Sequence, residues 1–337
     1  MLHDVMKSNK AIESFVSSGK IPGAVMQIGH GDSIDFVHAY GYAEIMPERR
    51  LMTENTLFDL ASVTKVTAVW PSIVRLLNER RIKLENTLNS MLDISSLPVD
   101  TSSITLHQLL THTAGFFPFI DTVGDTREER ILSLLKQPLM YKPGTQCVYS
   151  DLSFICLGEI ISHYSGVPLD EASKQIFLSL SMRDTGYLPD KSMSFASTEV
   201  VNGMTTCGTV HDERAQQLGG VAGHAGVFST ARDLGIFCSS ILSPGRHPLF
   251  MTEWVDQSFI RQTPLSNIRG LGWVIYADNE RGRLIGHTGF TGTSLLFCPE
   301  TAAYCVLLTN RIHPSRDNQF IAELRREVAL AVFGQEL

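Results

Sequence analysis

Three short motifs carry residue types that together could perform acyl transfer, and the first contains Ser62 and Lys65. The pair lies in an apolar, helix-like stretch, LFDLASVTKVTAVW. Residues three apart on a helix share a face, so the amine can reach the hydroxyl. Lysine can deprotonate serine when burial or positive charge lowers its pKa. Taken alone, however, the pair is more often a serine helix cap followed by a solvated lysine.

The second motif, Tyr149-Ser150-Asp151, follows a Pro143-Gly144 turn and precedes an apolar run. Asp151 is expected to cap the helix that this run forms. Tyr149 would then be held at an ordered junction, where a phenol beside an ammonium group can shuttle a proton. The alternative is a buried tyrosine under a capped helix.

The third motif, His287-Thr288-Gly289, lies between two strand-like segments. The surrounding glycines would let a substrate lie close along an edge strand. The backbone N–H of Phe290, together with that of Ser62, could form an oxyanion hole. A glycine-rich hairpin turn is the simpler reading of this motif alone.

Hydrophobic periodicity predicts the elements that must position these motifs. Pro71 interrupts one helical run, so a kink or break is expected there. The predicted elements are a helix over 4–18, strands over 23–29 and 34–43, helices over 62–80, 105–112, 126–136 and 151–165, strands from 269 onward, and a helix over 317–333.

This order predicts an α+β fold with an antiparallel sheet formed by both termini and flanked by helices. We expect a sheet region over 1–57 and 191–337 and an inserted, mainly helical region over 58–190. The active site would lie in the cleft between them. The glycine-rich segment 219–230 is expected to form a tight wall near this site.

Composition excludes several functions. The chain of 337 residues has a formal charge of −7 and no basic run, so nucleic-acid partners are not expected. No apolar segment is long enough for a membrane span, and the first residues do not form a signal peptide. Six scattered cysteines suit free thiols in a reducing cytoplasm, although a trimmed secreted chain would look the same. Neither a G-x-S-x-G elbow nor a zinc motif is present.

The three motifs, in this order and at these separations, resemble the serine β-lactamase and penicillin-binding-protein superfamily. The stretches LHQLLTHTAGF and GGVAGHAGVFSTARDL are similar to its class C-like branch, which includes family VIII esterases, D-aminopeptidases and low-molecular-weight D,D-peptidases. The resemblance covers residues 23–310 and implies a β-lactamase/transpeptidase-like fold.

The resemblance also implies roles for the motif residues. Ser62 would be acylated, and Lys65 and Tyr149 would share the general base and acid work. A substrate carboxylate would lie near His287 and Thr288. No metal or organic cofactor is implied, and the substrate would be a small ester, a D-amino-acid amide or a cell-wall peptide.

Two departures from class C β-lactamases weaken the case for a dedicated β-lactamase. Asp151 replaces an asparagine, so an acceptor-only carboxylate stands where an amide would donate. His287 replaces a lysine, so a group that titrates near neutrality stands where a permanent positive charge would be; if it binds a substrate carboxylate as an imidazolium, affinity for anionic substrates should fall as pH rises through its titration. A non-catalytic penicillin-type sensor or scaffold and a weak true β-lactamase are the alternatives. Neither the natural substrate nor the oligomeric state follows from the sequence.

Overall fold

The computed structural model describes residues 4–337 except 93, 95–96, 244–246, 251–252 and 266–267. The strands are β1 (Gly23–His30), β2 (Ser33–Glu44), β3 (Arg50–Leu51), β4 (Phe58–Asp59), β5 (Gly186–Tyr187), β6 (Val200–Val201), β7 (Met204–Thr205), β8 (Val227–Ser229), β9 (Val274–Asn279), β10 (Gly282–Thr288), β11 (Ser294–Cys298) and β12 (Ala303–Thr309). Seven of them form one sheet in the order β3-β2-β1-β12-β11-β10-β9.

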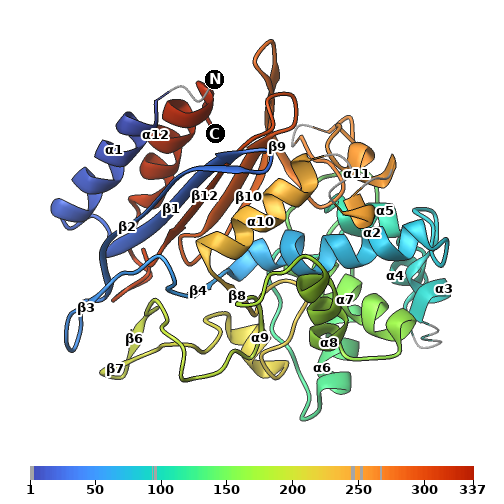
Figure 1. The fold of residues 1–337 in the computed structure, drawn as a ribbon. Helices are drawn as coiled ribbons and strands as arrows, with labels where there is room; N and C mark the ends of the chain where they lie inside the picture. Colours follow the sequence, from blue (N-terminus) through green and yellow to red (C-terminus); the bar gives the residue numbers. More distant parts are fainter. Residues whose placement is uncertain (1–3, 93, 95–96, 244–246, 251–252, 266–267) are drawn as a thin grey trace.

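The two ends of the chain meet in the middle of this sheet. β1 pairs antiparallel with β12, so that Met26 lies opposite Leu307. The other pairs in the sheet are antiparallel as well. Figure 1 shows the blue N-terminal strands beside the red C-terminal ones. An antiparallel sheet built from both termini is therefore confirmed.

Helices cover the sheet and form a separate layer beside it. They are α1 (Val5–Ser17), α2 (Trp70–Asn78), α3 (Leu88–Leu92), α4 (Val99–Ser102), α5 (Leu106–Leu110), α6 (Arg127–Leu135), α7 (Asp151–Ser165), α8 (Leu169–Ser179), α9 (Glu213–Gln217), α10 (Ala231–Leu242), α11 (Glu253–Ser258) and α12 (Ile321–Phe333). Within the described ranges, no single helix is long and apolar enough to cross a membrane, and α7 with α8 reaches that length only as a pair bent by 80°.

Strand β1 is buried along most of its length because helices pack on both faces of the sheet. Met26 packs with α1 and α12 on one face. Its neighbour Val25 points to the other face, into the larger core that α2, α7 and α10 share. In Figure 1, α1 and α12 lie side by side on the outer face, and α2–α8 lie beyond α10.

The run from 62 to 80 is helical but not one regular helix. A 3-10 turn, Ala61–Val63, leads into a π-helical segment, Lys65–Val69, and α2 then begins at Trp70. Pro71 is the second residue of α2 and directly follows the change from π-helical to α-helical structure. The chain stays helical through Pro71, so the break expected there is not found, and the helix only changes from π to α type just before this residue. π-helical turns often mark functional sites.

Candidate active site

Ser62 lies in the 3-10 turn and faces a cleft, with Lys65 one turn further along. Lys65 Nζ donates a hydrogen bond of 3.0 Å to Ser62 Oγ. The lysine side chain is fully buried, because the apolar neighbours Val63 and Val66 belong to the core. The three-residue spacing therefore brings the amine to the hydroxyl, as the sequence predicts.

Tyr149 approaches Ser62 from the loop before α7. Its hydroxyl lies 2.8 Å from Ser62 Oγ. The ring packs against His112 with centroids 4.6 Å apart, and the N–H of Ser150 donates to His112 Nδ1 at 3.2 Å. Burial lowers the pKa of His112 well below its ordinary value, with smaller effects from nearby cations. A neutral imidazole thus supports the tyrosine ring and the loop that carries it.

Asp151 does not cap α7, contrary to expectation. The hydroxyl of Ser150 caps the helix by accepting from the N–H of Leu152 at 3.3 Å. Asp151 instead accepts from Lys65 Nζ at 2.8 Å and from Arg214 Nη2 at 2.7 Å. Because serine already fills the cap position, the carboxylate can pair with these two buried cations.

The ion pair with Asp151 reverses the direction in which burial alone would shift the pKa of Lys65. Burial acts to lower this pKa, but the charge of Asp151 and, next, Tyr149 raise it above its ordinary value. Burial likewise acts to raise the pKa of Asp151, but Lys65, His224 and Arg214 hold it below its ordinary value. The condition for Lys65 to act as the base, a pKa lowered towards neutrality, is therefore not met, and Lys65 is an ammonium group at pH 7.

His287 is placed at the end of β10, next to the cleft, but it is only 3% exposed. Its Nδ1 lies 3.0 Å from the carbonyl of Thr288, which can only accept, so Nδ1 carries the hydrogen. Burial and then the charges of Lys65 and Arg269 lower the pKa of His287 to about 3. This contradicts a role for His287 as an imidazolium that binds a substrate carboxylate, because His287 is a neutral imidazole at pH 7.

Gly289 lets the turn after β10 approach the turn that carries Ser62. A Cβ at this position would lie 2.4 Å from the carbonyl oxygen of Leu60 and 2.2 Å from Thr293 Oγ1. Within the part of the chain that the structure describes, no backbone hydrogen bond uses the N–H of Ser62 or of Phe290. Both N–H groups are thus available to the cleft that these two residues line.

The glycine-rich segment 219–230 closes the other side of the site, as expected. Gly223 packs so tightly on α7 that a Cβ would lie 1.9 Å from the carbonyl oxygen of Phe154. This contact lets the carbonyl of His224 accept from Lys65 Nζ at 3.0 Å. The segment therefore forms one side of the site and also provides a hydrogen-bond acceptor for the ammonium group of Lys65.

The cleft has a volume of about 700 Å³ and is rich in arginine, although the chain as a whole is acidic. The guanidinium of Arg269 lies 5.4 Å from the centroid of the Tyr149 ring, and its Nη1 is buried with no hydrogen-bond partner among the residues that the structure describes. Such a lining favours an anionic substrate or a negative charge that develops during reaction. The charged lining residues are Asp151, Asp212, Glu213, Arg214, Arg269, Arg311, Arg316 and Arg325.

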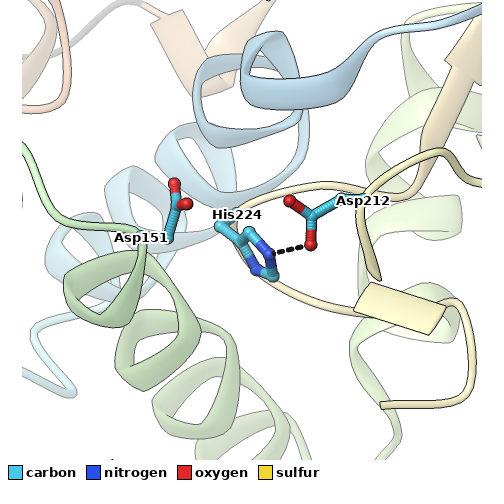
Figure 2. Close-up of side chains that lie close together, drawn as sticks. All are labelled: Asp151, Asp212 and His224. Atoms are coloured by element: carbon cyan, nitrogen blue, oxygen red, sulfur yellow. Dashed lines mark hydrogen bonds and ion pairs between the residues drawn. The ribbon is translucent and has the colours of Figure 1, made fainter. Parts of the chain in front are cut away.

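Asp151, Asp212 and His224 form a group that resembles a metal site, because one ligand atom of each lies within 4.8 Å of the others. Figure 2 shows His224 between the two carboxylates, with Nε2 bonded to Asp212 Oδ1 at 2.7 Å. Both oxygens of Asp151 already pair with Lys65 and Arg214. A divalent cation would compete with these two cations, so the residues fit an ion-pair network better than a metal centre.

The motifs did not identify Arg214, Arg269 or His112 as site residues. Arg214 and Arg269 come from segments without a motif, and only the folded chain brings them to Asp151 and Tyr149. His112 does lie in the stretch LHQLLTHTAGF that carries part of the family resemblance. The family resemblance of this stretch is the sequence feature that could have identified His112 as a site residue.

Comparison with known proteins gives consistent results. The family model "Beta-lactamase" matches residues 9–330. The "Putative D-alanyl-D-alanine carboxypeptidase" of Salmonella agona (strain SL483) is 29% identical, and the match covers 82% of this chain and 75% of the relative. The N-acetylmuramyl-L-alanine amidase of Bacillus subtilis (strain 168) is also 29% identical, with 91% and 81% covered.

A solved structure, the class C β-lactamase from Rhodobacter sphaeroides, superimposes with a TM-score of 0.77 at 21% identity. The superposition covers 96% of this chain and 97% of that one. The expected β-lactamase/transpeptidase-like fold is thereby confirmed.

Proposed function

The chain belongs to the beta-lactamase family, and we propose that it is a serine hydrolase that works through an acyl-Ser62 intermediate. One observation carries the proposal: Ser62 Oγ contacts both Lys65 Nζ and the Tyr149 hydroxyl, at 3.0 and 2.8 Å, in a large cleft. A nucleophile within hydrogen-bond reach of two proton-handling groups is the arrangement that acyl transfer needs.

Acylation begins with loss of the Ser62 proton. Because Lys65 is an ammonium group, the proposal assigns this proton to the oxygen of Tyr149, and the positive charges of Lys65 and Arg269 lie close to the ring of this residue. Ser62 Oγ then attacks the substrate carbonyl, whose oxygen becomes negative. The free N–H groups of Ser62 and Phe290 stabilise that oxyanion.

The second half of the reaction reverses the proton's path. Tyr149 gives its proton to the leaving amine or alkoxide as the tetrahedral intermediate breaks down, which leaves the acyl group on Ser62. A water molecule, deprotonated by the same phenol, then attacks the ester carbonyl. Hydrolysis releases the acid and restores the serine hydroxyl.

We infer that the preferred substrates are amides of the peptidoglycan type, or small esters, that carry a carboxylate. The names of two relatives, a carboxypeptidase for D-alanyl-D-alanine and an amidase for N-acetylmuramyl-L-alanine, support the first class. Arg269 supports the carboxylate, because its Nη1 is buried beside Tyr149 without a partner in the described part of the chain. We assign the carboxylate to Arg269 because His287 is neutral. Thr288 lines the same cleft.

Asp151 argues against efficient β-lactam hydrolysis. Both of its oxygens are engaged by cations, and a carboxylate cannot donate to a β-lactam amide carbonyl. We therefore infer that Asp151 organises Lys65 rather than binding the substrate amide.

The test is hydrolysis of p-nitrophenyl acetate and a panel of D-amino-acid amides, muropeptides and nitrocefin by the wild type and Ser62→Ala. Ser192→Ala, an exposed serine, is the matched control. We expect the Ser62 variant to lose turnover of every substrate that the wild type hydrolyses, and the control to keep it. Full activity in Ser62→Ala would refute the proposal. Stable stoichiometric labelling of the wild type by a fluorescent penicillin, without turnover of any substrate, would favour a sensor instead.

A further inference from the structure

Asp59 is a buried carboxylate that the reaction described above does not use. It ends β4, three residues before Ser62, and is only 3% exposed. One oxygen accepts from the backbone N–H of Ala61 at 2.9 Å, and the other accepts from that of His211 at 2.6 Å. A buried carboxylate is costly to maintain unless its hydrogen bonds are satisfied, and here they come from two distant segments of the chain.

The Ala61 contact holds an unusual backbone conformation next to the nucleophile. Ala61 has φ of +46°, in the left-handed region that residues with a side chain rarely adopt. Such conformations persist only where surrounding contacts enforce them, and they cluster at functional sites. Because Ala61 precedes Ser62, its conformation sets the direction of the Ser62 N–H and hydroxyl.

The same stretch is tied to the opposite wall of the proposed oxyanion hole. The backbone carbonyl of Asp59 accepts from Thr291 Oγ1 at 2.7 Å, and that of Leu60 accepts from Thr293 Oγ1 at 3.0 Å. Both threonines follow Phe290 in the connection between β10 and β11. This connection therefore cannot shift without disturbing the backbone of Asp59.

His211 provides a third connection to the same wall. Its ring stacks on the ring of Phe290, with centroids 5.7 Å apart and planes 19° apart. Since Asp59 fixes the N–H of His211, one carboxylate holds both the turn of Ser62 and the residue that packs on Phe290.

We propose that Asp59 is a positioning residue that keeps the N–H groups of Ser62 and Phe290 aligned for acylation. This inference rests on the proposed acyl-Ser62 reaction and adds a residue that acts through others. Asp59→Asn keeps one acceptor oxygen but turns an N–H₂ group toward a backbone N–H, so one of its two contacts must break. A displacement of about 1 Å is enough to slow such a reaction about 100-fold.

The test measures the pre-steady-state acylation rate of Ser62 by p-nitrophenyl acetate, with thermal unfolding measured on the same samples. Asp233→Asn is the matched control, because Asp233 is also buried and accepts from a backbone N–H and a hydroxyl, those of Asp184 and Thr185. We expect Asp59→Asn to acylate about 10- to 100-fold more slowly with KM changed less than about twofold. Both contacts of Asp233 are to its Oδ2, which asparagine can replace with its own oxygen, and the control should acylate at the wild-type rate.

A second pair of variants covers the case in which Asp59→Asn does not fold. Thr291→Val removes the hydroxyl that binds the Asp59 carbonyl, and Thr291→Ser keeps it. We expect the valine variant to acylate more slowly and the serine variant to match the wild type. Folded Asp59→Asn or Thr291→Val protein that acylates at the wild-type rate would overturn the role of Asp59 alone. A wild type that forms no acyl-serine would overturn the proposed function as well.

Discussion

Replacement of Asp151 by asparagine should leave two buried cations facing each other. Asp151 contacts Lys65 Nζ at 2.8 Å and Arg214 Nη2 at 2.7 Å, and the two cationic side chains are 0% and 7% exposed. Removing one partner of a buried ion pair typically costs about 3–5 kcal/mol. We therefore expect Asp151→Asn to lower the free energy of unfolding by about that amount.

Arg214 provides the second half of the prediction. In Asp151→Asn/Arg214→Leu, Lys65 no longer faces a second unpaired cation, so the double variant should be more stable than Asp151→Asn alone. The coupling energy in the double-mutant cycle should be about 2 kcal/mol. Urea unfolding gives the stability of the wild type, both single variants and the double variant. The control is Asp190→Asn, at an exposed carboxylate, which should change the free energy of unfolding by less than about 0.5 kcal/mol.

The same variant tests the charge of Lys65 through the pH–rate profile. Asp151 is the principal group that raises the pKa of Lys65, so Asp151→Asn lowers it. If the ammonium form is active, activity is lost as pH rises through this pKa, and the loss should begin at a lower pH in the variant. Stability changes that are additive in the double variant would refute this account of the ion pair. So would a loss of activity at high pH that begins at the same pH in Asp151→Asn as in the wild type.

Two further residues give predictions that the same methods can check. His287 titrates near 3 in the folded chain and near its ordinary value when unfolded, so the unfolded chain binds more protons between these values and acidification destabilises the fold. From pH 7 to pH 5 the wild type should lose about 2 kcal/mol more than His287→Gln, and equal losses in urea unfolding would contradict the neutral imidazole. KM for an anionic substrate should show no titration of His287 between pH 5 and 8. Arg269→Gln should raise KM at least tenfold for a substrate with a free carboxylate but not for its methyl ester, with Arg232→Gln as an exposed control; an equal change for both would remove Arg269 from carboxylate binding.

Local patterns predicted the parts of the site that depend on local geometry. The spacing of Ser62 and Lys65 predicts their contact because one helical turn determines it. The glycine at 289 is needed for a close backbone approach, which its type already indicates. The strands of both chain ends were likewise found from alternation and turn residues.

Long-range electrostatics accounts for what the sequence did not predict. The pKa of Lys65 was expected to fall because its neighbours are apolar, but Asp151, 86 residues away, reverses the direction. The sequence left the charge of His287 open because the burial that lowers its pKa cannot be read from the motif. Asp151 was expected to cap α7 because aspartate is a common N-cap residue. Serine is an equally good N-cap residue, and Ser150 takes the position instead.

The central claim is that Ser62 becomes acylated with help from Tyr149. Rapid quenching of the wild type with p-nitrophenyl acetate, followed by peptide mass spectrometry, tests it most directly. The account predicts one acetyl group per chain, located on Ser62, that forms before steady-state turnover and forms far more slowly in Tyr149→Phe. An acetyl group on another residue, or turnover with no covalent intermediate on Ser62, would contradict it.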